Sequence, residues 1–138
     1  MKISARIANQ ASEHKVVLVT DEHEHFLTVP PKLDGFGSSV NGGELLFLAL
    51  ATCYCNDLYR EARKRRIEIK RVQVEVSGEF GGEGEAARNI TYCASVDASV
   101  PDEEVLELMR LTDSLAEIQN TLRGSVPVIL LNCEARRV

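Results

Sequence analysis

Apolar and polar positions alternate in short runs over the first 30 residues of the chain. Three of these runs, Lys2–Ala8, Lys15–Thr20 and His25–Pro30, have the length and the β-branched content of strands. Turn-forming residues follow the first run, and Asp21 and Glu22 separate the second run from the third. The pattern therefore predicts a meander of three strands.

The period changes after the loop PPKLDGFGSS, which is dense in Pro, Gly and Ser. From Gly43 to about Arg66 the apolar residues recur at helical spacing. This predicts a helix of about 23 residues, roughly 35 Å long, which must cross the core of a small domain. Cys53 shares one line of the helix with Leu46, Leu50 and Asp57, whereas Cys55 shares another with Leu48, Ala51, Leu58 and Ala62.

The second half of the chain alternates strand and helix patterns. A long hairpin is predicted at Ile67–Phe80 and Asn89–Val100, joined by the loop GGEGEAAR. Two helices follow, at Pro101–Leu115 and Ser114–Arg123, and a last strand covers Val126–Ala135. Strands, a long central helix, strands, two shorter helices and a final strand indicate a single α+β domain over residues 1–138.

Composition narrows the function classes. The hydrophobic share of 44% and the charged share of 27% are typical of a globular protein. A net charge of −5, spread over both halves, argues against a nucleic-acid partner and against anionic membranes. The N-terminus lacks a signal-peptide pattern, and no apolar run approaches a membrane span, so we expect a cytoplasmic protein.

Candidate metal and cofactor sites are weak. His23 and His25 share a strand face, but no third ligand is in view, so we expect them to be solvated and predict no metal. The segment GFGSS lacks the Lys and the glycine spacing of a phosphate-binding loop, and we predict no cofactor.

The four cysteines are at positions 53, 55, 93 and 133. Their number and spacing are unlike those of a disulfide scaffold or a zinc site, so we expect free thiols. Cys53 and Cys55 point about 200° apart on the predicted helix, which disfavours both a disulfide between them and shared metal binding. A helical cysteine among Leu and Ala is more often an inert, packed side chain than a reactive thiol, by roughly three to one.

Two stretches resemble the OsmC/Ohr family of thiol peroxidases. The segment NGGELLFLALATCYC is similar to the family's helix entry, with Asn41 on the family's Asn and Cys53 on its reactive cysteine. The segment AEIQNTLRGSVPV is similar to the family's second motif, with Asn120, Arg123, Gly124 and Val126 in register. The resemblance implies an OsmC-like α+β fold, with the long helix packed on a curved antiparallel sheet, and an intertwined homodimer with its sites at the subunit interface.

The resemblance also implies a chemistry. In the family the first cysteine reduces an organic hydroperoxide and becomes a sulfenic acid, and a second cysteine then forms a disulfide with it. Register places Ala116 at that second cysteine and Glu117 at the Pro that follows it. The family's thiolate is held by an early-loop Arg and a Glu of the helix entry. The early loop NQASEHK contains no Arg, so the candidate site is Cys53 with Glu44 and Arg6.

Two functions follow from these residues. One is reduction of an organic hydroperoxide by Cys53, with regeneration by Cys93, Cys133, a partner-subunit thiol or an external thiol reductant; Cys55 is disfavoured by its direction. The alternative is a protein without peroxidase activity that binds a small apolar ligand in the dimer-interface cleft.

Overall fold

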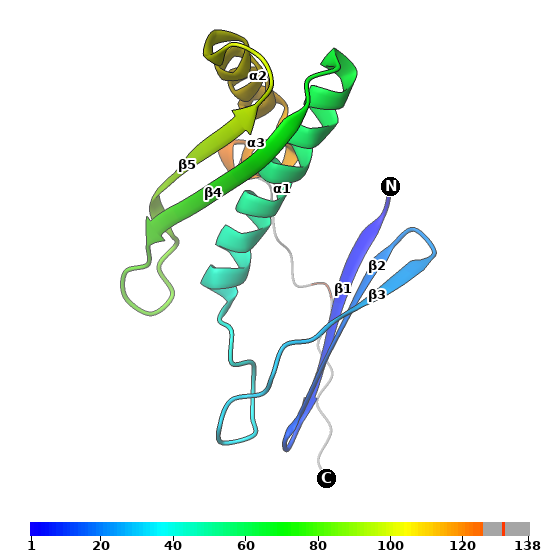
Figure 1. The fold of residues 1–138 in the computed structure, drawn as a ribbon. Helices are drawn as coiled ribbons and strands as arrows, with labels where there is room; N and C mark the ends of the chain where they lie inside the picture. The colour runs from blue at the N-terminus through cyan, green and yellow to red at the C-terminus, as the bar shows by residue number, and fades with distance from the viewer. Residues whose placement is uncertain (126–130, 132–138) are drawn as a thin grey trace. The chain divides into compact units, whose positions relative to one another are not determined.

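The computed structural model describes residues 1–125 and 131, in which the chain forms five strands and three helices (Figure 1). The chain divides into two compact units, Met1–Leu46 and Phe47–Val138. The predicted α+β class is confirmed, whereas a single domain over residues 1–138 stays a prediction. The predicted strand Val126–Ala135, with Cys133, lies outside the described residues except for Leu131.

The first unit contains an antiparallel sheet with the strand order β1-β2-β3. Its strands are β1 (Ile3–Gln10), β2 (Glu13–Thr20) and β3 (His23–Leu27), which confirms the predicted meander. The third strand starts two residues earlier than predicted, because Asp21 adopts a φ of 52° in a two-residue turn that pairs Thr20 with His23.

One face of this sheet carries apolar side chains. The β1–β2 register pairs Ile3 with Thr20, Ala5 with Leu18 and Ile7 with Val16, so that these side chains share a face. Ile3 and Ile7 are 67% and 59% exposed. The face therefore has more apolar surface open to contact than a solvated strand needs.

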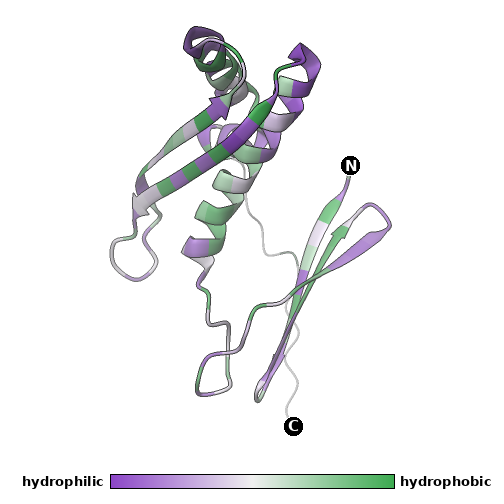
Figure 2. Cartoon of the chain, viewed as in Figure 1, coloured by the Kyte–Doolittle hydropathy of each residue, from purple (hydrophilic) through white to green (hydrophobic). Residues whose placement is uncertain are grey.

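The second unit is built on the long helix α1 (Gly42–Arg65), which begins at the end of the first unit. Strand β4 (Ile69–Glu79) pairs antiparallel with β5 (Arg88–Ala98), as the hairpin pattern predicts. Figure 2 shows hydropathy alternating along both strands. Val72, Val74 and Val76 are half-buried and the residues between them are exposed, so one face of the hairpin packs and the other is polar.

The core of the second unit lies between α1 and the β4–β5 hairpin. Tyr54, Leu58 and Ala62, spaced by one helical turn each, are buried on the side of α1 that packs on the strands. The predicted long helix packed against an antiparallel sheet is confirmed. Further contacts to this core come from Leu108, Ala116, Val72, Val74, Tyr92 and Val96.

Two shorter helices, α2 (Asp102–Leu115) and α3 (Glu117–Arg123), follow the hairpin. The sequence pattern predicted that the second of them begins at Ser114. In the structure α2 continues through Leu115, and Ala116 then adopts extended angles (φ −64°, ψ 109°) that separate the two helices. The buried Ala116 therefore sets the direction in which Glu117 enters α3.

Candidate functional site

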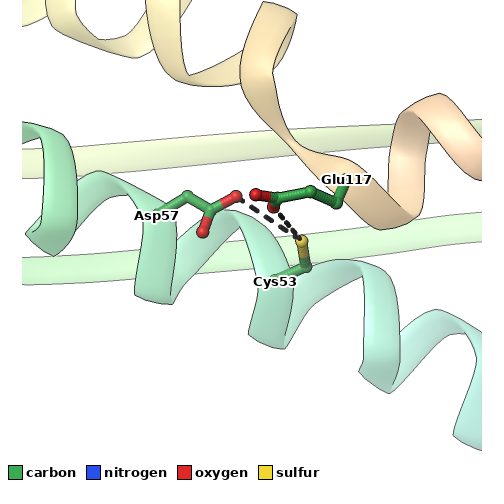
Figure 3. Close-up of side chains that lie close together, drawn as sticks. All are labelled: Cys53, Asp57 and Glu117. Atoms are coloured by element: carbon green, nitrogen blue, oxygen red, sulfur yellow. Dashed lines mark hydrogen bonds between the residues drawn. The ribbon is translucent and has the colours of Figure 1, made fainter. Parts of the chain in front are cut away.

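Cys53 lies in the middle of α1, half-buried, with carboxylates from two elements close to its sulfur (Figure 3). Its Sγ is 3.6 Å from Asp57 Oδ2 and 3.9 Å from Glu117 Oε2. Asp57 faces the same side because it follows Cys53 by four residues on the helix. Glu117 reaches the sulfur from the first turn of α3.

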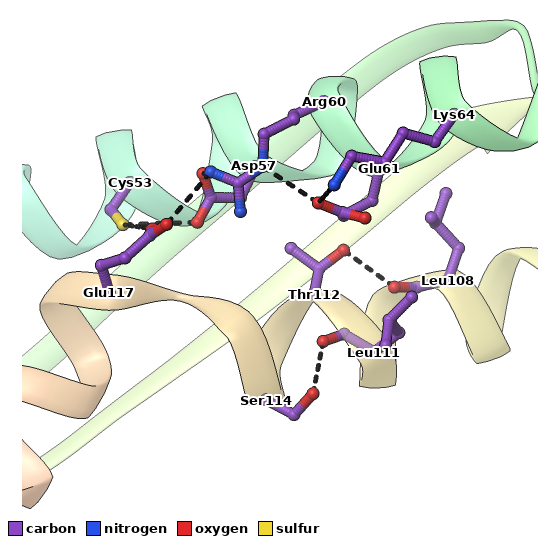
Figure 4. A network of polar contacts seen from close by, with 10 residues as sticks. All are labelled: Cys53, Asp57, Arg60, Glu61, Lys64, Leu108, Leu111, Thr112, Ser114 and Glu117. Atoms are coloured by element: carbon purple, nitrogen blue, oxygen red, sulfur yellow. Dashed lines mark hydrogen bonds and ion pairs between the residues drawn. The ribbon is translucent and has the colours of Figure 1, made fainter.

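A cation links the two carboxylates (Figure 4). Arg60 Nη1 is 2.8 Å from Asp57 Oδ1 and 3.2 Å from Glu117 Oε1. Its Nε donates to Glu61 Oε1 at 2.9 Å, and Lys64 Nζ donates to the same oxygen at 2.8 Å. Asp57 and Glu61 are both buried, so this charge pairing satisfies acids that would otherwise be costly to bury.

The surroundings of Cys53 favour its neutral thiol. Burial raises the pKa of Cys53, the backbone amide of Ile118 lowers it, and the negative charges of Asp57 and Glu117 raise it further. Burial and the contact with Glu117 raise the pKa of Asp57, against the opposing effect of Arg60. The pKa of Glu117 is lowered by its backbone hydrogen bond and by its contacts with Asp57 and Arg60. Asp57 is therefore the carboxylate that more readily holds a proton.

The predicted partners of Cys53 have other contacts. Glu44 Oε2 accepts the backbone N–H of Asn41 at 2.7 Å, and Asn41 Oδ1 accepts the backbone N–H of Glu44 at 2.9 Å. This reciprocal pair caps the start of α1. Arg6 lies on β1 and pairs with Glu24 at 3.7 Å, with both side chains exposed. The roles of Glu44 and Arg6 toward Cys53 stay predictions.

Sequence reasoning missed three residues of this site. It placed Asp57 on the line of Cys53 without giving it a role, although a carboxylate four residues after a cysteine on a helix is a usable signal. Arg60 lies in the basic run REARKRRIEIKR, which by pattern alone is typical of a solvated helix end and gives no sign of a site. Sequence reasoning placed Glu117 only by motif register, because a contact across 64 residues of sequence depends on the tertiary fold.

In the described part of the chain, Cys53, Asp57 and Glu117 form the group with the geometry for a metal ion, their ligand atoms lying within 4.8 Å of one another. Arg60 Nη1 already contacts an oxygen of each carboxylate and offsets part of their negative charge, and we therefore assign no metal. His23 and His25 are exposed on the same face of β3, as predicted.

The other described cysteines are free thiols. Cys55 is partly buried on α1, two residues after Cys53 and hence on a different side of the helix. Cys93 is exposed on β5, among the outward-facing polar residues.

A cavity of about 310 Å³ lies where α1, β5 and α3 meet. Leu50, one turn before Cys53, lines it together with Ile90, Tyr92, Gln119 and Leu122. Gln119 Nε2 donates to the Leu50 carbonyl oxygen at 3.0 Å, which ties α3 to α1 and helps to hold Glu117 near Cys53.

No helix in residues 1–125 combines the length and the apolar character needed to cross a membrane.

Solved structures share this fold at low sequence identity. An OsmC-like protein from Mycoplasma pneumoniae is 21% identical, with 90% of this chain and 87% of that chain covered and a TM-score of 0.60. An organic hydroperoxide resistance protein OsmC from Legionella pneumophila is 19% identical, with 90% of each chain covered and a TM-score of 0.52. A structure from Vibrio cholerae with captopril bound in one of its active sites is 22% identical, with 91% of this chain and 86% of that chain covered and a TM-score of 0.52.

No curated protein matches the chain. The family model for OsmC-like protein, however, matches residues 35–130, which include Cys53, Asp57 and Glu117. The chain therefore belongs to the OsmC-like protein family.

Proposed function

We propose that the chain is a thiol-dependent peroxidase of the OsmC type, in which Cys53 reduces an organic hydroperoxide. The observation that carries the proposal is the position of Cys53: a half-buried thiol, inside the family match, next to a carboxylate that can accept its proton. Solved structures of the same fold include hydroperoxide resistance proteins, which supports the choice of substrate class.

The proposed reaction is a displacement at the peroxide bond. The sulfur of Cys53 attacks the distal oxygen of the hydroperoxide, an S–O bond forms, and the O–O bond breaks. Cys53 becomes a sulfenic acid and the hydroperoxide leaves as an alcohol, which takes up the proton lost by the thiol. Two electrons pass from sulfur to oxygen, and no cofactor is required.

Regeneration is assigned to an external thiol. The family resemblance implies that Ala116 takes the position of the family's second cysteine, and Ala116 is buried next to Glu117 in sequence. Two equivalents of a thiol would return Cys53–SOH to the free thiol and release a disulfide and water. This need for a reductant fits the predicted cytoplasmic location. We also propose that the protein works as a homodimer, as its family resemblance implies.

The test compares Cys53→Ala with Cys55→Ala, a matched loss of one thiol from the same helix. Purified protein is mixed with stoichiometric cumene hydroperoxide, and the site of oxidation is mapped by intact-protein mass spectrometry with a sulfenic-acid trap. We expect oxidation confined to Cys53, loss of hydroperoxide consumption in Cys53→Ala and retention in Cys55→Ala. Unchanged consumption by Cys53→Ala would end the proposal.

A second function, binding of a small apolar ligand, is favoured by the cavity next to Leu50. Gln119 lines this cavity, and its buried Oε1 has no hydrogen-bond partner among the residues described. A ligand with an apolar body and one hydrogen-bond donor would match this lining. Native mass spectrometry would support it by showing a co-purified ligand that Gln119→Leu loses, in a protein that consumes no hydroperoxide.

A further inference from the structure

The contacts of Cys53 identify where its proton can go. The sulfur lies against Asp57 on its own helix and against Glu117 on α3, at 3.6 and 3.9 Å (Figure 3). A carboxylate is an acceptor, so an S–H between these two groups acts as the donor. Within the described residues, Arg60 is the cation that contacts both of these carboxylates, through Asp57 Oδ1 and Glu117 Oε1. The sulfur of Cys53 faces the other oxygen of each group, Asp57 Oδ2 and Glu117 Oε2.

We propose that Asp57 and Glu117 control the proton of Cys53, holding the thiol neutral at rest and accepting its proton when the sulfur attacks, with Arg60 positioning both carboxylates. The peroxide step of this inference rests on the proposed function. The control of the thiol proton does not, because any electrophile that reacts with Cys53 must displace the same proton.

The charge balance supports a short proton transfer. Moving the proton from Sγ to Asp57 leaves the net charge of the cluster unchanged, so no new charge is created in a partly buried site. The carboxylic acid so formed can protonate the departing alkoxide, which returns Asp57 to its charged state. The thiol proton therefore ends on the alcohol, as the reaction requires.

The groups facing Cys53 come from each element around it. On α1 these are Asp57, which contacts the sulfur, and Arg60, which contacts Asp57 but not the sulfur. On α3 they are Glu117 and the backbone amide of Ile118. The β4–β5 side contributes apolar packing. The hydroxyl of Tyr92 on this side donates its hydrogen bond to Asp113 on α2 rather than to the sulfur. Asp57 and Glu117 are thus the charged side chains with the most direct effect on the sulfur.

Arg60 is a positioning residue, because it contacts both carboxylates and not the sulfur. The four bonds that Arg60 and Lys64 make with Asp57, Glu61 and Glu117 tie two turns of α1 to the start of α3 (Figure 4). Loss of the guanidinium would remove the positive charge that contacts both Asp57 and Glu117, which makes the neighbouring thiol harder to ionise.

The experiment measures the pH profile of Cys53 alkylation by iodoacetamide, mapped by mass spectrometry, beside hydroperoxide consumption. The variants are Asp57→Asn, Glu117→Gln, Arg60→Ala and Arg60→Lys. Glu107→Gln and Arg65→Ala are the controls, because these two residues form a separate ion pair between α1 and α2. All six variants are first compared with the wild-type protein by circular dichroism.

Asp57→Asn and Glu117→Gln are expected to shift the alkylation profile to lower pH and to raise the rate near neutral pH about threefold or more, because a negative charge next to the sulfur is lost. Hydroperoxide consumption should fall about tenfold in Asp57→Asn, because the proton acceptor is lost, and less in Glu117→Gln, which keeps Asp57. Arg60→Ala should shift the profile to higher pH and Arg60→Lys should restore part of the shift, whereas the controls should match the wild type.

The two proposals fail in different ways. Profiles of Asp57→Asn and Glu117→Gln that coincide with the wild-type profile would overturn the inference, even if the wild type reduces hydroperoxides. Shifted profiles in a protein that consumes no hydroperoxide would overturn the proposed function and leave the control of the thiol proton supported.

Discussion

Leu58 is a fully buried residue in the core of the second unit. Its side chain is 0% exposed and contacts the cluster that joins α1 to the β4–β5 hairpin. Leu48, on the same helix, is 57% exposed. The two leucines therefore allow the cost of a cavity to be separated from a change of helix propensity.

We predict that Leu58→Ala lowers the free energy of unfolding by about 2–5 kcal/mol, because it leaves a cavity in a closely packed core. Leu48→Ala should change it by about 0.5 kcal/mol or less, since that side chain has little packing to lose. Urea unfolding followed by circular dichroism measures both. Equal effects of the two substitutions would show that the core does not rest on Leu58.

A second prediction concerns Asp113, which accepts a hydrogen bond from the Tyr92 hydroxyl and forms an ion pair with Arg123 Nη2 at 2.7 Å. The Tyr92 bond and then Arg123 lower the pKa of Asp113. Because the folded pKa lies below the unfolded value, the stabilisation is present at neutral pH and is lost as the pH falls below about 4.

Asp113→Asn should therefore reduce stability at neutral pH and make stability depend less on pH in the acid range. Asp97→Asn, which removes an exposed ion pair with Arg71, is the control. Thermal unfolding at a series of pH values measures the difference. An Asp113→Asn curve parallel to that of the wild type at all pH values would contradict the assignment.

At the scale of the element, the start of α1 is defined by side chains. Asn41 and Glu44 exchange hydrogen bonds with each other's backbone N–H groups, and these groups have no partner inside the helix. The helix entry that resembles the family motif is thus a stable structural start in this chain. A catalytic role for Glu44 would have to coexist with this cap.

Substitutions at Glu44 separate the two roles. Asn41→Ala should lower stability by about 1 kcal/mol through loss of the cap. Glu44→Gln keeps an acceptor at the same position and should preserve stability, whereas Glu44→Ala should not. If hydroperoxide consumption follows stability across these variants, Glu44 acts as a cap; a loss of consumption in the stable Glu44→Gln would instead support the predicted catalytic role.

The sequence predicts the helices and strands more completely than it predicts the contacts of the candidate site. Helix α1 and the β4–β5 hairpin follow local periodicity, and their predicted bounds agree closely with the structure. The break at Ala116 does not, because alanine has no local preference for extended angles and the break depends on burial of this residue. Motif register predicted Cys53, but the contacts of Glu117 and Arg60 depend on how α3 packs on α1, which local patterns do not contain.

At the scale of the whole molecule, the exposed apolar face of the first sheet is the feature to explain. Ile3, Ala5 and Ile7 are exposed on this face, which they share with the half-buried Leu18, the buried Val16 and the exposed His23 and His25. An exposed apolar face of this kind marks a contact surface in soluble proteins. The proposed homodimer would supply the contact, because a two-fold dimer places the same patch on both subunits.

We predict that the wild-type protein sediments with the mass of two chains and that Ile7→Asp sediments with the mass of one, because a carboxylate buried in an apolar interface would lack a partner. Ser4→Asp adds the same charge to β1 on the opposite face of the sheet, since Ser4 pairs with Val19, and should stay a dimer. Analytical ultracentrifugation distinguishes the cases. A wild-type monomer would refute the homodimer, and dissociation by both substitutions would show that charge on β1, rather than the apolar face, controls association.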